Sequence, residues 1–275
     1  MNDISDTVHP LDEAKPDGKP GASKETAIDV RCRGEPNDPR GKPGGFPNTG
    51  TDPRVGWNKW NTWMTAHAPF IALDGLDGTG KSTQCHLLAA WLRGLGLDPV
   101  VTVDPGGTAI GDTIRNLLLQ HRPAWGMSLP CEALLFMASR AQLVAEVIRP
   151  ALAAGRPVVS DRFLLANVVY QGHAGGLDPD RLWEIGRFAT GGLEPDLTVV
   201  LDLPPELALA RRDRPPDRVE SRDAGYQARV REGFLAEARR HPQSIRVVDA
   251  SGPVEAVHEQ IRQEVARVME ARAGA

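Results

Sequence analysis

The most informative segment of the chain reads Phe70-Ile71-Ala72-Leu73-Asp74-Gly75-Leu76-Asp77-Gly78-Thr79-Gly80-Lys81-Ser82-Thr83. Its continuous apolar start predicts a buried strand, its glycines predict a tight loop, and the residues after them begin a helical period. Gly-x-x-x-x-Gly-Lys-Ser is the Walker A pattern. A strand before the pattern and a helix after it are the context that gives it meaning.

This glycine loop has the chemistry of a site for nucleotide phosphates. Glycines let backbone N–H groups turn toward phosphate oxygens without a Cβ in the way, and the helix N-terminus adds partial positive charge. Lys81 would neutralise the β- and γ-phosphates, and the hydroxyl of Ser82 would ligate Mg²⁺. A glycine-rich connector with a chance lysine is the alternative, and the strand–loop–helix order argues against it.

Apolar runs alternate with helical patterns from residue 66 onward. Strands are predicted at 70–73, 99–103, 157–160, 197–201 and 245–248. Helices are predicted after Lys81, at about 108–121, 130–154 and 253–272, and before the fifth strand. Continuous apolar strands between helices imply a parallel sheet that is covered on both faces. The predicted fold class is therefore α/β.

The first 65 residues differ in composition from the rest. They contain eight prolines and eight glycines, and no apolar period persists among them. Such a segment buries too little surface to offset its ordering entropy, so we expect residues 1–65 to be mostly disordered and residues 66–275 to form the domain. Trp57, Trp60 and Trp63 could rest on the folded domain or serve a partner. Either residues 1–63 are an extension or translation starts at Met64.

Charge and cysteine content narrow the function classes. The 275-residue chain has a net charge of −4, which gives no reason to expect bulk binding to nucleic acid or anionic lipid. No apolar run approaches the length of a membrane span, and the N-terminus lacks a secretory signal. Cys32, Cys85 and Cys131 form neither a disulfide framework nor a zinc pattern, so a reducing cytoplasm fits best.

Three further features could bind the group that accepts the phosphate. Asp161 and Arg162 end the third strand, where open α/β sheets place ligands, although a simple ion pair would also fit. Phe136 and Arg140 share one helix face, which would suit a ligand site. An apolar helix that simply carries a core Phe and a surface Arg is an equally good explanation. A basic cluster around Pro215-Pro216 could be an active lid or a solvated face; it comprises Arg211, Arg212, Arg214 and Arg218.

Residues 69–270 resemble the thymidylate kinase family along their whole length. The segments that carry the resemblance are Asp74 to Thr83, Pro105-Gly106-Gly107-Thr108, Leu135-Phe136, Ser139-Arg140-Ala141, Asp161-Arg162-Phe163, Tyr170-Gln171-Gly172, Pro195-Asp196-Leu197, Leu201-Asp202-Leu203 and Asp217-Arg218-Val219-Glu220. Many NTPases share the Walker A pattern, whereas the Pro-Gly-Gly-Thr, Asp-Arg-aromatic and Tyr-Gln segments in this order are much more specific.

The resemblance implies a P-loop NTPase fold with a five-stranded parallel sheet and a mobile lid at about 211–220. It implies transfer of the γ-phosphoryl group of ATP to dTMP with Mg²⁺, in a cytoplasmic homodimer that binds neither nucleic acid nor membrane. The implied catalytic residues are Lys81, Asp77, Arg162, Arg212 and Arg214, the last two as lid arginines of the bacterial type. The implied ATP site comprises Gly75, Leu76, Asp77, Gly78, Thr79, Gly80, Lys81, Ser82 and Thr83.

The implied dTMP site comprises Phe136, Arg140, Arg162, Asn167, Tyr170 and Gln171. By resemblance, Phe136 stacks on thymine, Arg140 and Asn167 read the base, Arg162 holds the acceptor phosphate, and Tyr170 crowds the sugar 2′ position. The implied metal ligands are Ser82 and Asp161.

The chain also departs from the family pattern. Val103-Asp104 stands where the family usually has Arg-Glu, Ala166 replaces a common serine, and Asp74 replaces a usual glutamate. We expect these changes to weaken dTMP binding rather than change base preference. Two alternatives remain: a kinase for another nucleoside monophosphate, and a degenerate nucleotide-binding scaffold or regulator. Joint retention of Lys81 and Arg162 argues against the scaffold.

Overall fold

A computed structural model describes residues 68–120, 126–212 and 224–273. Five parallel strands form its sheet in the order β2-β3-β1-β4-β5. The strands are β1 (Phe70–Gly75), β2 (Val100–Val103), β3 (Val158–Asp161), β4 (Leu197–Asp202) and β5 (Ile245–Asp249). The five strands predicted from the apolar runs are thus confirmed, and so is the α/β class.

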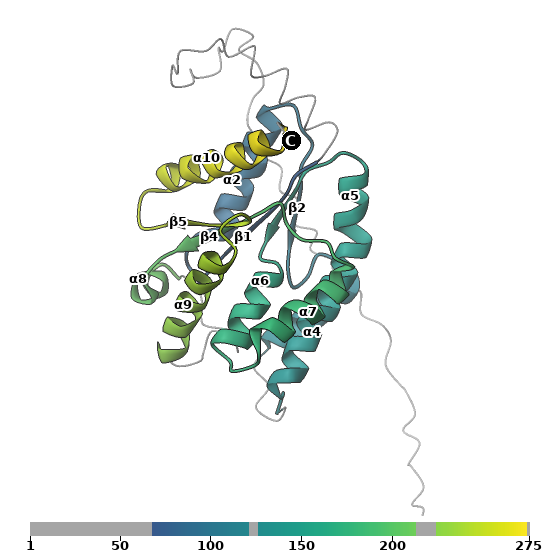
Figure 1. The fold of residues 1–275 in the computed structure, drawn as a ribbon, viewed down its shortest axis with the longest axis vertical. Helices are drawn as coiled ribbons and strands as arrows, with labels where there is room; N and C mark the ends of the chain where they lie inside the picture. The colour runs from purple at the N-terminus through teal and green to yellow at the C-terminus, as the bar shows by residue number, and fades with distance from the viewer. Residues whose placement is uncertain (1–67, 121–125, 213–223, 274–275) are drawn as a thin grey trace, which may run out of the picture. The chain divides into compact units, whose positions relative to one another are not determined.

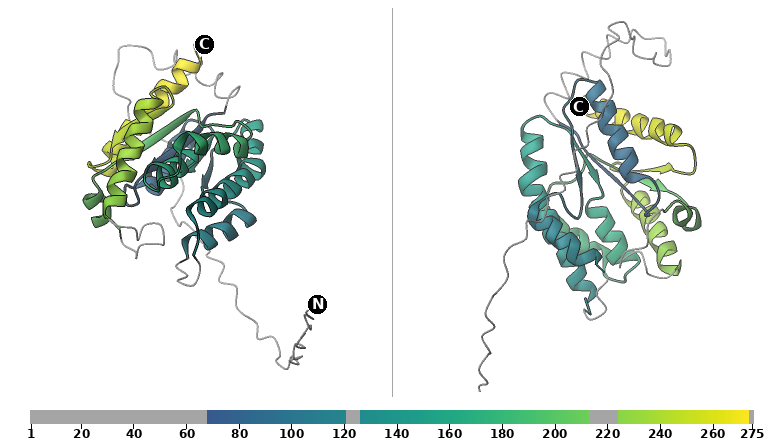
Figure 2. Two further views of the ribbon diagram at one scale, coloured as in Figure 1. Left: turned by 60° about the horizontal axis from the view of Figure 1, so that its bottom comes forward. Right: turned by 180° about the vertical axis from the view of Figure 1, so that it is seen from behind.

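Helices cover both faces of the sheet (Figure 1). They are α2 (Lys81–Gly94), α3 (Ala109–Leu119), α4 (Leu129–Leu143), α5 (Arg149–Ala153), α6 (Leu164–Asn167), α7 (Pro179–Thr190), α8 (Pro205–Ala210), α9 (Ala224–Arg240) and α10 (Val254–Ala273), with π-helical segments η1 (Val144–Ile148) and η2 (Val168–His173). The first and last of these helices, blue and yellow, lie side by side in Figure 1 and in the right-hand view of Figure 2.

The central strand β1 divides its side chains between the two layers of helices. Ile71 and Leu73 are fully buried in the cluster that includes the inner faces of α2 and α10. Phe70 and Ala72 belong to the second cluster, with residues of α4, α5 and α6. This alternation follows from the period of two in a strand, and burial of both faces explains why the β1 sequence is continuously apolar.

The predicted helix at 130–154 is not one regular helix. It runs as α4, then the π-helical segment η1, then α5. Pro150 lies in the first turn of α5, where its missing N–H and its ring interrupt regular α-helical bonding, and the wider π turn precedes it. The second π-helical segment, η2, carries Tyr170 and Gln171 toward the carboxyl ends of the strands.

Several sequence predictions concern residues outside the described ranges. The disorder expected for residues 1–65 and most of the lid expected at about 211–220 are among them. The Trp57, Trp60 and Trp63 cluster lies there, and so do Arg214 and Arg218 of the basic cluster. Among the described helices, none is both long and apolar enough to cross a membrane.

Candidate active site

A cavity of about 430 Å³ opens at the carboxyl ends of the parallel strands. This is the edge at which open α/β sheets bind ligands, and the volume suits a small-molecule site. Many residues singled out from the sequence line it: Asp77, Gly78, Gly80, Lys81, Ser82, Thr83, Phe136, Arg140, Asp161, Arg162, Asn167, Tyr170, Gln171 and Arg212. One cavity therefore joins the glycine loop to the residues proposed to bind the acceptor.

The glycine loop at 75–80 needs glycine for two distinct reasons. Gly75 and Gly78 have φ values of 133° and 91°, a region that side chains disfavour. A Cβ on Gly75 would lie 2.5 Å from the Leu201 carbonyl oxygen, and one on Gly78 would lie 2.1 Å from that of Ala208. The loop is thus wedged against β4 and α8. It ends where α2 begins at Lys81, so the helix N-terminus faces the cavity.

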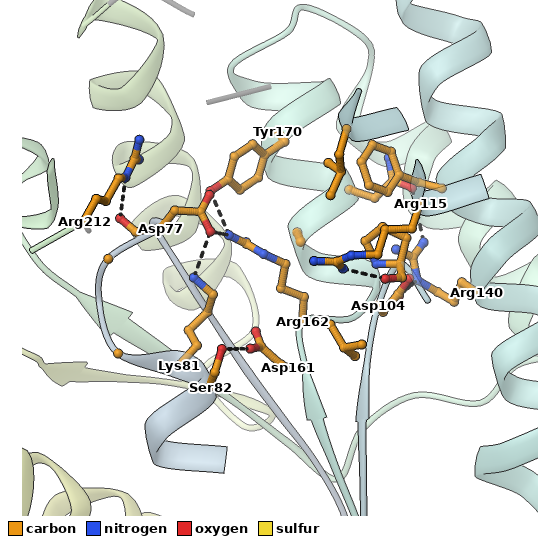
Figure 3. A pocket seen from close by; sticks show the side chains of 18 of the residues that line it. Asp77, Lys81, Ser82, Asp104, Arg115, Arg140, Asp161, Arg162, Tyr170 and Arg212 are labelled. Carbon is orange, nitrogen blue, oxygen red and sulfur yellow. Dashed lines mark hydrogen bonds and ion pairs between the residues drawn. The ribbon is translucent and has the colours of Figure 1, made fainter. Parts of the chain in front are cut away.

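Lys81 is almost completely buried beside this loop. Its Nζ donates to the carbonyl oxygens of Leu76 at 2.7 Å and Gly75 at 3.2 Å, and lies 3.4 Å from Asp77 Oδ1. Burial and the nearby charge of Arg162 lower the pKa of the Lys81 ammonium, while Asp77 acts in the opposite direction. The cation is therefore held inside the loop at the place where phosphate charge would gather (Figure 3).

Arg162 joins the end of β3 to the glycine loop. Its Nη2 donates to Asp77 Oδ1 at 2.6 Å and to the Tyr170 hydroxyl at 3.3 Å, and its Nη1 donates to the Gly75 carbonyl at 3.1 Å. The guanidinium also lies 5.0 Å from the centre of the Tyr170 ring. Burial opposes ionisation of Asp77, but Arg162 and Lys81 outweigh it and hold the carboxyl pKa well below its usual range.

The backbone of Arg162 is strained. Its φ of 70° makes it the one non-glycine residue with positive φ in the described ranges. Such strain costs on the order of 1–3 kcal/mol and is found at functional sites. Here it accompanies the turn that brings the side chain from the strand end into the cavity. The Asp74 carboxylate lies 3.7 Å from Nη1, fully buried, and burial raises its pKa to about 7.

Ser82 and Asp161 meet across the cavity floor. Ser82 Oγ donates to Asp161 Oδ2 at 2.5 Å (Figure 3). A hydroxyl and a carboxylate are hard oxygen donors of the kind Mg²⁺ prefers, and Mg²⁺ is usually held by one or two such groups together with substrate phosphates. In the described part of the chain, no cluster of three or more His, Cys, Asp or Glu could hold a metal. The pair therefore fits a phosphate-bound Mg²⁺ rather than a protein-caged ion.

The far end of the cavity is built on a buried ion pair. Arg140 Nε donates to Asp104 Oδ2 at 2.5 Å, and each residue is at most 2% exposed. Arg140 Nη1 donates to Asn167 Oδ1 at 3.2 Å, and Nη2 to the Phe163 carbonyl at 3.4 Å. Burial raises the pKa of Asp104, while Arg140 opposes that shift. The Arg140 guanidinium thus lines the cavity without being a surface charge.

The sequence reasoning missed three polar residues at this end. Arg115 lines the cavity from α3, and its Nη1 donates to the Pro105 carbonyl at 2.7 Å. Asp104 departs from the family pattern in sequence, and in the structure it is the ion-pair partner of Arg140. Glu132 is buried beneath Gln171. A charged residue within an apolar helix pattern was the available signal for Glu132.

The described lid arginines have different contacts. Arg211 donates to the carbonyl oxygens of Ala250 at 2.7 Å and Ser251 at 3.0 Å, which ties α8 to the end of β5. Arg212 Nε lies 3.4 Å from the Asp77 carbonyl oxygen and reaches the glycine loop. Both line the cavity. Of the predicted catalytic pair, Arg212 is thus adjacent to the phosphate site, and Arg214 is outside the described residues.

The cavity has the glycine loop at one end and a buried group of hydrogen-bonded side chains at the other. The Asp77–Arg162 pair lies between these two ends. On a five-stranded parallel sheet, this arrangement defines a P-loop kinase that acts on a nucleotide.

Comparison with known proteins narrows the class. The thymidylate kinase family model matches residues 73–261. Thymidylate kinase from Symbiobacterium thermophilum is 49% identical over 204 residues, covering 74% of this chain and 95% of that protein. Thymidylate kinase from Rhodopirellula baltica is 47% identical over 191 residues, covering 70% and 77% respectively. The crystal structure of thymidylate kinase from Ehrlichia chaffeensis matches with a TM-score of 0.60 at 28% identity, covering 72% of this chain and 99% of that one. The chain belongs to the thymidylate kinase family.

Proposed function

We propose that this chain transfers the γ-phosphoryl group of ATP to dTMP and releases dTDP and ADP. The observation that carries the proposal is the single cavity that holds the glycine loop, the Asp77–Arg162 pair and the Arg140–Asn167 pair. ATP would occupy the glycine-loop end and dTMP the Arg140 end, so that their phosphates would meet beside Arg162. Family membership supports the same reaction.

ATP phosphates would be held by the loop at 75–83. Backbone N–H groups of the loop and of the first turn of α2 supply donors, and Lys81 supplies positive charge. Ser82 and Asp161 would hold Mg²⁺, which neutralises charge on the phosphate oxygens when it is bound. Because phosphoryl transfer leaves little covalent chemistry to the protein, these groups act by positioning and by electrostatic stabilisation.

The acceptor would lie between Arg162 and Arg140. Arg162 would hold its phosphate, and Tyr170, fixed against Arg162, would crowd a 2′-hydroxyl and favour deoxyribose. Phe136 lines the cavity where the base would stack. The Arg140 guanidinium offers only donors, and Asn167 Oδ1 offers an acceptor beside it. That donor–acceptor pair complements O4 and N3–H of thymine and opposes the reversed edge of cytosine.

We also propose a homodimer, consistent with the family resemblance. Leu134 on α4 is 55% exposed and Phe188 on α7 is 88% exposed, and burying them in a dimer would remove this apolar surface from water. Light scattering of the purified protein should give twice the chain mass. We also propose a cytoplasmic location because the family resemblance implies one. We propose no nucleic-acid or membrane partner.

The activity test uses the full chain with ATP and Mg²⁺ in a coupled assay of ADP release. Measuring kcat/KM for dTMP, dUMP, dCMP and UMP side by side should place dTMP first, with dUMP ahead of UMP. Ala166 and Val103 stand where the family usually has polar residues, so KM for dTMP should be higher than with the usual residues, while the order of preference among the bases stays the same. A higher kcat/KM for dCMP or UMP would assign the chain to a different monophosphate, and no turnover with any of them would support the scaffold alternative.

A further inference from the structure

A continuous hydrogen-bonded chain of side chains runs behind the base end of the cavity. Its order is Asp104, Arg140, Asn167, Gln171 and Glu132, and every member is at most 2% exposed. Asn167 Nδ2 donates to Gln171 Oε1 at 2.7 Å, and Gln171 Nε2 donates to Glu132 Oε1 at 2.7 Å. The hydrogen-bonded series joins α4 to α6 and η2, and its last member, Glu132, is not among the residues assigned to contact substrate.

Arg140 and Glu132 impose the same orientation on the two side-chain amides that lie between them, those of Asn167 and Gln171. Arg140 can only donate, so the oxygen of Asn167 must face it. Glu132 Oε1 accepts from Gln171 Nε2, so the nitrogen of Gln171 faces Glu132 and its oxygen faces Asn167. Both requirements are met together only when Asn167 Nδ2 points at Gln171 Oε1. The orientation of the Asn167 amide is therefore fixed from both sides.

Glu132 is needed to hold the two amides in place because a bound substrate would compete for the hydrogen bonds that Arg140 donates. A base that takes hydrogen bonds from Arg140 competes with Asn167 for the same guanidinium. Turning over the Asn167 amide would remove one of the two obstacles to cytosine, because a donor would then meet its N3 while Arg140 still faces its amino group. Turning the amide requires Gln171 to turn as well, and its oxygen would then face the Glu132 carboxylate. Two acceptors facing each other in a buried site are costly.

We propose that Glu132 and Gln171 are positioning residues that select thymine over cytosine by locking the Asn167 amide. This inference rests on the proposed function and adds to it. It reassigns Gln171 from contact with dTMP to action through Asn167, since both ends of the Gln171 amide are already bonded within the protein.

Three variants test the lock, each measured with dTMP and dCMP. Glu132→Gln replaces an acceptor with a group that can also donate, so the reversed amide chain becomes possible. Gln171→Met removes the link at similar volume. In the double variant Glu132→Gln/Gln171→Glu, a carboxylate at position 171 again faces Asn167 Nδ2 and can only accept, so the lock is restored with its members exchanged.

The lock predicts a change in selectivity rather than in turnover. The ratio of kcat/KM for dTMP to that for dCMP should fall roughly three- to tenfold in each single variant, mainly through KM, and return to within about threefold of wild type in the double variant. Glu146→Gln is the matched control, because Glu146 accepts from Gln142 in an exposed Gln–Glu pair on the same helical stretch. It should leave the ratio unchanged.

Two results would overturn the lock: single variants with wild-type selectivity, or a double variant no better than the singles. Wild-type turnover of dTMP in the same assay reports separately on the proposed function. A readout that needs no substrate is the hydrogen exchange of the Asn167 side-chain amide by NMR in the free protein. Glu132→Gln should speed that exchange and Glu146→Gln should not; equal exchange in all three proteins would contradict the lock even if the enzyme is active.

Discussion

Arg162 Nη2 lies 2.6 Å from Asp77 Oδ1, and this contact joins the end of β3 to the middle of the phosphate loop. Because Nη1 of the same guanidinium bonds the Gly75 carbonyl, the two groups form a fork that only arginine can supply. The contact places a cation, held in its charged form by Asp77, between the two ends of the cavity. It also couples the proposed acceptor side of the cavity to the loop that we propose to bind ATP.

Arg162→Lys should therefore fail to replace arginine. Lysine keeps the charge but cannot bond Gly75 and Asp77 together, so we expect KM for dTMP to rise at least about tenfold, since hydrogen bonds to charged groups contribute about 1.5–3 kcal/mol each. Steady-state kinetics with dTMP varied would measure it. Arg156→Lys is the control, because Arg156 pairs with Asp98 at the exposed start of β3. A KM for Arg162→Lys within twofold of wild type would show that charge alone suffices.

Alanine substitutions at three glycines should distinguish the effect of steric crowding from the effect of a positive φ. Gly78→Ala should be the most damaging, because its Cβ would meet the Ala208 oxygen at 2.1 Å and its φ is positive. Gly80→Ala should be milder, since its φ is 91° but no atom lies within 4 Å of the added Cβ. Gly94→Ala, in open space within α2, should stabilise the fold by about 0.5–1 kcal/mol. Urea unfolding and ATP affinity measure the series, and equal effects at Gly78 and Gly80 would contradict the contact with α8.

The order of elements and the phosphate loop were predictable because both depend on local sequence. Apolar runs set the strands, and the loop pattern combines its glycines with Lys81 within eight residues. Long-range contacts were not readable in this way. The Asp104–Arg140 pair joins residues 36 apart in the chain, so the sequence shows Asp104 only as a departure from the family's usual residue. Nothing in the local sequence indicates that a shorter carboxylate there still reaches the guanidinium.

Backbone details of the site were also beyond the sequence. A positive φ at Arg162 carries no residue-type signal, since arginine does not favour that region. The π-helical segment that carries Tyr170 and Gln171 has no proline to mark it, unlike the one that precedes Pro150. Both features follow from how the strand end and its helix are packed together, so they emerge only with the fold.

A chain that begins at Met64 should keep its activity. The described fold starts at residue 68, the family model matches from residue 73, and all the site residues lie further along the chain. Removing residues 1–63 should leave kcat and KM for dTMP within about twofold of the full chain, and the melting temperature should change little. A large drop in melting temperature would show that the Trp57, Trp60 and Trp63 cluster contributes to the domain. Intact-mass measurement of the native protein would identify which start is used.

The two described lid arginines should give different defects. Arg211→Ala removes the bonds to Ala250 and Ser251, so it should lower stability by about 1–3 kcal/mol while kcat at 25 °C stays within a few fold. Arg212→Ala should lower kcat on the order of tenfold or more, because its guanidinium lies against the phosphate loop where charge develops. Denaturant unfolding and steady-state kinetics on both variants distinguish these roles. If Arg212→Ala kept normal turnover, the catalytic role would pass to the arginines outside the described residues.

Asp74 should make stability depend on pH in an unusual direction. Burial raises its pKa from 3.8 to about 7, although Arg162 and Lys81 oppose the shift, and neither carboxylate oxygen has a hydrogen-bond partner among the described residues. Between pH 4 and 7 the folded protein therefore holds a proton that the unfolded chain has released. By linkage, this contribution to stability is complete below about pH 4 and is lost as the pH rises through about 7.

Asp74→Asn removes that titration at nearly constant shape. The free energy of unfolding of wild type minus that of Asp74→Asn should fall by a few kcal/mol, at most about 4, between pH 4 and 8, because each unit of pKa shift corresponds to about 1.4 kcal/mol. Urea titrations at four pH values would measure the difference. Asp98→Asn, at an exposed carboxylate before β2, is the control and should leave the wild-type pH profile unchanged. A difference between wild type and Asp74→Asn that stays constant or grows with pH would mean that Asp74 is charged throughout this range, with Arg162 outweighing its burial.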